Sequence, residues 1–153
     1  MDVLDLPPTT ASVPVARRFV RARLVDDAAR SADGRADASV DVDTATLLVS
    51  EVVTNAILHA RSAVTLTVDV PEDVVRITVR DGSPVQPRVH AFAPTSATGR
   101  GLLLLDHLAK RWGVEPDPVT RGKVVWFEVG EPSLAAWGEV SGHRLSAATS
   151  RGD

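Results

Sequence analysis

The strongest constraint on the fold is a pair of alternating segments separated by a short turn. Apolar residues occupy every second position of residues 64–70 and of residues 75–79, with polar residues between them. The intervening Pro71-Glu72-Asp73 is typical of a turn. Two such segments predict an antiparallel hairpin with one buried face. A chain of 153 residues is long enough for one domain that covers this face, and too short for two ordinary domains.

Two helices are predicted before the hairpin. Ser12 can cap the first, which runs from about Pro14 to Ala29 and tolerates proline in its first turn. Asp41 or Asp43 can cap the second, which runs to about His59.

The part of the chain after the hairpin predicts a loop, a third helix and a further strand. Residues 82–98 contain Pro, Gly and Ser without a clear period, and we interpret this loop as a lid. The apolar segment from Leu102 to Leu108 fits a buried helix that ends near Arg111. Trp112-Gly113-Val114 then enters a short strand or turn, and Lys123 to Val129 is a strand.

The periodic part of the sequence defines a domain over residues 13–130. Residues 1–12 form an N-terminal lead, and residues 131–153 form a C-terminal extension. Residues 134–137 can form a small helix, whereas residues 141–153 have the composition of a disordered tail.

Charge and cysteine content narrow the class of protein. The net charge of −3 gives no broad attraction to nucleic acid or to an anionic membrane. The sequence contains no cysteine, so disulfides and thiolate metal sites are excluded. The acidic N-terminus lacks the basic n-region and apolar run typical of a signal peptide, and no segment approaches the roughly 18 apolar residues of a membrane span. We therefore expect a cytoplasmic protein.

Three polar residues spaced four apart run along one flank of the second helix: Glu51, Asn55 and His59. The broad apolar face of the helix borders this flank on one side, and Leu47 and Leu58 border it on the other. An isolated E-x-x-x-N pattern is most simply a polar flank that bonds neighbouring loops. The apolar borders and two further features point instead to a site.

The first further feature is Asp81, which strand alternation places on the buried side of the predicted hairpin. Taken alone, Asp81-Gly82-Ser83-Pro84 is also good turn chemistry. The second is Gly99-Arg100-Gly101-Leu102 at a helix start, where backbone amides can meet phosphate. No strand directly precedes these glycines, and no G-x-x-x-x-G-K-[ST] loop occurs in the chain, so a different nucleotide-binding fold is required.

Four segments in this order resemble the GHKL-type ATPase domain (Bergerat fold) shared by gyrase, histidine kinases and mismatch-repair proteins. They are residues 51–60, 79–83, 99–102 and 122–126. Within that family they are similar to the anti-sigma-factor serine/threonine protein kinase branch. The resemblance covers about Pro14 to Val129. It implies an α+β two-layer sandwich, with a mixed, mainly antiparallel sheet covered on one face by helices and ATP between the layers.

The resemblance also implies residue roles. Asn55 would coordinate Mg²⁺, and Glu51 would act as the general base, which suits the preference of Mg²⁺ for oxygen and the need of phosphoryl transfer for a proton acceptor. Asp81 would accept a hydrogen bond from the adenine amino group. The segment from Gly99 to Leu102 would approach the phosphates, where Arg100 either contacts phosphate or is solvated. His59 would be structural.

The chain departs from the family pattern at two places. The adenine motif is usually D-x-G-x-G, whereas Ser83 and Val85 replace its two glycines, which leaves the affinity for adenine open. Lys123 stands where the superfamily commonly has a hydroxyl residue. It can contact phosphate or be a solvent-facing strand residue, and we favour the second interpretation.

The function that the resemblance implies is a kinase that sequesters a sigma factor and phosphorylates an antagonist protein on serine, usually as a homodimer. The alternative is a nucleotide-responsive regulatory binding module without kinase activity, in which ATP only orders the lid. An ATP-hydrolysing or histidine-phosphorylating enzyme is disfavoured, because no phosphoacceptor helix or receiver segment fits in this length.

Overall fold

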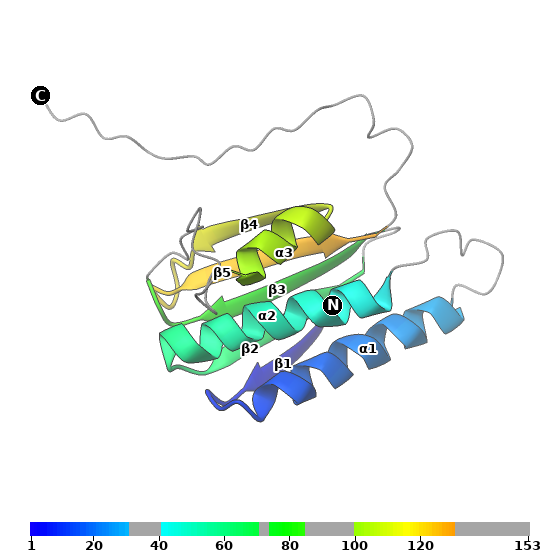
Figure 1. Ribbon diagram of the computed structural model, residues 1–153. Coiled ribbons are helices and arrows are strands. Elements are labelled where there is room, and N and C mark those ends of the chain that lie inside the picture. Colours follow the sequence, from blue (N-terminus) through cyan, green and yellow to red (C-terminus); the bar gives the residue numbers. More distant parts are fainter. Residues whose placement is uncertain (31–40, 71–73, 85–99, 131–153) are drawn as a thin grey trace, which may run out of the picture.

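A computed structural model describes residues 1–30, 41–70, 74–84 and 100–130, which form one five-stranded sheet and three helices (Figure 1). The elements in chain order are β1 (Asp2–Leu6), α1 (Ser12–Arg30), α2 (Val42–Ala60), β2 (Val64–Asp69), β3 (Val75–Asp81), α3 (Arg100–Leu108), β4 (Arg111–Pro116) and β5 (Lys123–Val129). The spatial order is β1-β2-β3-β5-β4. All pairs among these described strands are antiparallel, and the predicted α+β sandwich is confirmed.

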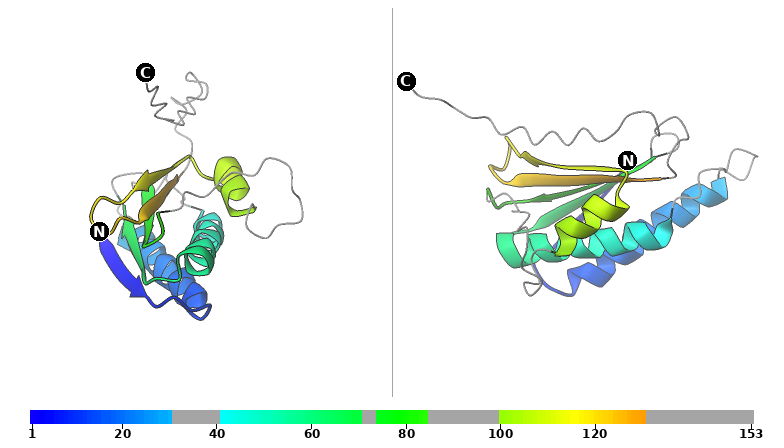
Figure 2. Two further views of the ribbon diagram at one scale, coloured as in Figure 1. Left: turned by 90° about the vertical axis from the view of Figure 1, so that its left-hand side faces the viewer. Right: turned by 45° about the horizontal axis from the view of Figure 1, so that its top comes forward.

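The helices cover one face of the sheet, as the end-on view shows (Figure 2). Alternate residues of β2, β3 and β5 face the helices because side chains of a strand point to opposite faces in turn. Phe127 of β5 is fully buried between the layers, and Leu48 of α2 and Leu105 of α3 are buried with it. The hydrophobic core therefore lies between the sheet and the three helices.

Helix α2, the helix that carries Glu51 and Asn55, has a well-defined start and end. Of the two predicted caps, Asp41 is the N-cap, and its Oδ1 accepts hydrogen bonds from the backbone N–H groups of Asp43 and Thr44, both at 3.0 Å. The Thr44 hydroxyl is the main cause that lowers the pKa of the Asp41 carboxyl. The helix ends at Ala60, before Arg61 adopts a left-handed conformation with φ of 49°.

The N-terminal lead contains a strand that the sequence analysis did not assign. Residues Asp2–Leu6 form the edge strand β1 and pair with β2. Asp2 interrupts the apolar alternation of this strand, and it accepts a hydrogen bond from Arg23 of α1. Helix α1 begins at Ser12, whose buried hydroxyl donates to the carbonyl oxygen of Pro7 at 2.7 Å. These contacts hold the lead against α1 and the sheet.

Several predicted segments lie outside the described residues: the loop before α2, the turn at 71–73, the lid beyond residue 84, the helix at 134–137 and the tail at 141–153. No helix in the described ranges is long and apolar enough to cross a membrane.

Candidate functional site

The predicted flank of α2 lies against the start of α3. Glu51 and Asn55 are both partly exposed, one helical turn apart. A Cβ atom placed on Gly101 would lie 2.7 Å from Nδ2 of Asn55 and 3.3 Å from Cβ of Glu51. The missing side chain at position 101 therefore lets the first turn of α3 approach these two residues closely. The structure brings three of the predicted site residues together here.

The other residues of the glycine segment occupy different environments. Arg100 is the first residue of α3, and Gly99 lies outside the described residues. Leu102 is buried in the hydrophobic core. His59 is exposed at the end of α2.

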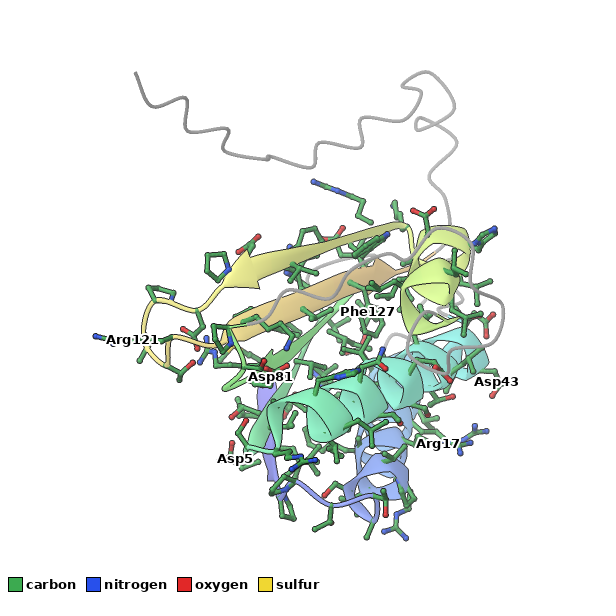
Figure 3. All side chains as sticks on the ribbon, turned by 60° about the vertical axis from the view of Figure 1, so that its left-hand side comes forward. Asp5, Arg17, Asp43, Asp81, Arg121 and Phe127 are labelled. Carbon is green, nitrogen blue, oxygen red and sulfur yellow. The ribbon has the colours of Figure 1, made fainter. Side chains whose placement is uncertain are left out.

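Asp81 ends the core-facing row of β3, as the alternation predicted, and the whole residue is only 2% exposed. Figure 3 shows it toward the end of the sheet that carries Arg121, with Phe127 farther along. Its Oδ1 accepts a hydrogen bond from the backbone N–H of Ser83 at 2.8 Å. Its Oδ2 is buried and has no hydrogen-bond partner among the described residues. The two oxygens of one carboxylate thus have different environments.

Lys123 is the partner of Asp81, and our interpretation of it as a solvent-facing residue is wrong. The two residues are register partners in β3 and β5, and Nζ of Lys123 lies 2.9 Å from Oδ1 of Asp81. Their side chains are 7% and 1% exposed, respectively. Alternation back from Phe127 and Val125 places Lys123 on the core-facing side of β5, so the sequence did contain the signal.

Two glycines fix the backbone around Asp81. The N–H of Gly82 donates to Oγ of Ser62, just after α2, at 2.9 Å. A Cβ atom on Gly122 would lie 1.8 Å from the carbonyl oxygen of Asp81, which is an impossible contact. The end of β3 is therefore held between the end of α2 and the start of β5.

The turn that leads into β5 is built around Asp117, a residue that the sequence analysis did not single out. Its carboxylate accepts hydrogen bonds from the hydroxyl of Thr120 at 2.6 Å and the N–H of Val119 at 3.0 Å. Arg80 of β3 forms an ion pair with it at 3.0 Å. The Thr120 hydroxyl first, and then the Val119 N–H, hold the pKa of Asp117 below its ordinary value. This network fixes the turn directly before Gly122.

The sequence profile of the histidine kinase-like ATPase domain matches residues 6–129. A search of curated proteins found no match. The matched range extends from the last residue of β1 to the last residue of β5, and it includes Glu51, Asn55, Asp81 and Gly101. The chain therefore belongs to the histidine kinase-like ATPase domain family, the GHKL-type group of ATP-binding domains.

Proposed function

We propose that this protein binds Mg²⁺-ATP between the helices and the sheet and transfers the terminal phosphoryl group to a serine of an antagonist protein. In this proposal it also sequesters a sigma factor, as a homodimer, like the anti-sigma-factor kinases that its motifs resemble. The family membership supports nucleotide binding. The arrangement of the described residues supports binding of the base at one end of the site and of the phosphates at the other.

The observation that carries the proposal is the unpartnered Oδ2 of Asp81. A buried carboxylate oxygen without a donor is energetically costly, and such groups normally have a hydrogen-bond partner. The exocyclic amino group of adenine is a donor of the required kind. The position of Asp81 at the end of β3, next to the end of α2, supports an orientation with the base at this end of the site.

The phosphates would lie at the start of α3, where the helix dipole and free backbone N–H groups favour an anion. Asn55 adjoins Gly101 there and offers a side-chain carbonyl oxygen as a ligand for Mg²⁺. In the described ranges, no three His, Asp or Glu side chains are grouped as a metal site. A single protein ligand is compatible with Mg²⁺, which is commonly held by phosphate oxygens, water and only one or two protein groups.

Glu51 is the candidate general base. It lies one turn before Asn55 and close to Gly101, and its side chain is partly exposed, so an incoming hydroxyl can reach it. In the proposed reaction the serine oxygen bonds to the terminal phosphorus while the bond from phosphorus to the bridging oxygen breaks. ADP leaves, and Glu51 takes the serine proton.

The test is phosphoryl transfer from labelled Mg²⁺-ATP to a candidate antagonist protein encoded beside the gene for this chain. Glu51→Gln should abolish transfer and leave ATP binding intact, because glutamine keeps the size of the side chain but cannot take a proton. Glu115→Gln, on strand β4 rather than helix α2, is the matched control and should transfer like the wild type. Transfer by Glu51→Gln at the wild-type rate would refute the role of Glu51.

The same experiment separates the kinase from the regulatory binding module without kinase activity. The altered residue Ser83 in the adenine motif favours the module, since a weakened pocket could still serve as a sensor. If the wild type binds ATP but phosphorylates no antagonist, the module is the function.

A further inference from the structure

The two carboxylate oxygens of Asp81 have opposite surroundings, and one side chain is a principal cause. Oδ1 accepts from the backbone N–H of Ser83 at 2.8 Å and from Nζ of Lys123 at 2.9 Å. Oδ2 is equally buried but has no described partner. Both partners of Oδ1 can only donate, because a backbone N–H and an ammonium group have no acceptor function.

We propose that Lys123 is a specificity-determining residue, which positions residue 81 so that a hydrogen-bond acceptor faces the purine base. This inference rests on the proposed function, in which the base of the nucleotide binds at Asp81. By occupying Oδ1, Lys123 leaves Oδ2 as the acceptor for the ligand and restricts rotation of the carboxylate. The ligand class is a 6-aminopurine nucleotide.

A 6-oxopurine presents the wrong group to this acceptor. In inosine triphosphate a carbonyl oxygen replaces the amino group of ATP. That oxygen and Oδ2 of Asp81 are both acceptors, so neither is satisfied and their partial charges repel. Buried polar groups that are left unpaired by an analogue are an effective means of discrimination.

A purely structural ion pair would behave differently. A buried Lys–Asp pair that only joins β3 to β5 contributes to stability, and its removal would weaken the binding of all purine nucleotides by the same factor. If the pair positions the acceptor, its removal should weaken the binding of ATP more than that of inosine triphosphate, because only the amino group of ATP can donate to Oδ2. The ratio of the two dissociation constants therefore separates the two roles.

The first experiment measures equilibrium binding of ATP and inosine triphosphate, both with Mg²⁺, by calorimetry on the full chain. The wild type should bind ATP at least about tenfold more tightly, as expected for one correctly paired buried group. Lys123→Met, which keeps the length of the side chain but removes its donor, should reduce this ratio at least about threefold. An unchanged ratio in folded Lys123→Met would overturn the proposal.

The second experiment reverses the preference. In Asp81→Asn, the donors of Lys123 and Ser83 should hold the amide oxygen at the Oδ1 position, so the amide NH₂ faces the base. This variant should bind inosine triphosphate more tightly than ATP. The double variant, Asp81→Asn with Lys123→Met, should lose most of that reversed preference, because only the Ser83 N–H still orients the amide. Continued preference of folded Asp81→Asn for ATP would contradict the proposal.

Circular dichroism and thermal melting of each variant establish that it is folded. If Asp81→Asn does not fold, the ratio of dissociation constants measured for Lys123→Met is the test of the proposal. Different results refute the proposed function and the role of Lys123. Absence of binding of either nucleotide to the wild type would refute the proposed function. ATP binding by the wild type without any preference over inosine triphosphate would refute only the role of Lys123.

Discussion

Lys123 and Asp81 form a buried ion pair with 2.9 Å between Nζ and Oδ1, although they are 42 residues apart in the sequence. The pair joins the last residue of β3 to the first residue of β5, and it lies at the end of the sheet where Gly82 bonds to Ser62 after α2. Two segments that resemble separate family motifs thus form one structural unit. The acceptor at Asp81 depends on both of them.

Removal of one partner of this pair should be strongly destabilising. Lys123→Met leaves a buried carboxylate without its cation, and such losses typically cost about 3–5 kcal/mol of unfolding free energy. Urea denaturation followed by circular dichroism measures the change. Arg21→Ala is the control, because it breaks the exposed ion pair with Asp43 and should cost less than about 1 kcal/mol. If both substitutions lowered the unfolding free energy by the same amount, the buried pair would contribute no more to stability than the exposed one.

Gly122→Ala, at the candidate site, and Gly113→Ala, on the opposite face of the sheet, should have different effects on ATP binding. The added methyl at position 122 would overlap the carbonyl oxygen of Asp81 at 1.8 Å, so β3 and β5 must move apart and ATP binding should fall together with stability. The methyl at position 113 would meet the Trp126 ring at 2.8 Å instead. Gly113→Ala should therefore lower the melting temperature with little effect on ATP affinity. Wild-type ATP affinity and stability in Gly122→Ala would contradict this assignment.

Gly101→Ala should weaken nucleotide binding without unfolding the protein. Its methyl would lie 2.7 Å from Nδ2 of Asn55, and the end of that side chain can rotate away at little cost. In the proposed site the displaced Asn55 would no longer hold Mg²⁺, so the affinity for Mg²⁺-ATP should fall about tenfold, which corresponds to about 1.4 kcal/mol. Leu103→Ala, at an exposed position of the same helix, should leave the affinity unchanged. The two affinities are compared by calorimetry, and equal values for both variants would count against the Asn55 assignment.

Most of the fold was predictable because its core-facing residues follow regular periods. The helix with Glu51 and Asn55 and the hairpin strands β2 and β3 each show a period that local sequence reveals. Strand β1 was missed because an inward-facing aspartate, Asp2, breaks its alternation. The compensating Arg23 is contributed by α1, and only the tertiary structure brings the two together.

The sequence indicated the residues of the candidate site but not the contacts between them. Strand register alone placed Asp81 on the buried side. The same argument applied to Lys123. A lysine is rarely fully buried unless it is paired, however, and this tendency favoured the solvent-facing interpretation. The partner lies on β3, three elements earlier in the chain, and strand pairing across the intervening α3 and β4 cannot be obtained from local periodicity.

The turn around Asp117 should make stability depend on pH in acid. The folded-state pKa of Asp117 is lowered below the ordinary value of 3.8, so the folded protein favours the charged carboxylate. Its stabilising contribution is therefore complete above pH 3.8 and is lost as the pH falls through the folded-state pKa. Asp117→Asn should lower the melting temperature at neutral pH, and the difference from the wild type should shrink toward about pH 3. Melting curves of both proteins across this pH range measure the difference in melting temperature. A difference that grows in acid would contradict the stabilising role of the Asp117 carboxylate.

The most direct test of the central claim is calorimetric titration of the purified protein with ATP, with and without Mg²⁺, for the wild type and Asn55→Ala. The site built from Glu51, Asn55, Asp81 and Gly101 predicts saturable ATP binding by the wild type that Mg²⁺ strengthens. It also predicts that Asn55→Ala loses most of the strengthening by Mg²⁺. No detectable ATP binding by the folded wild type, with or without Mg²⁺, would contradict the account.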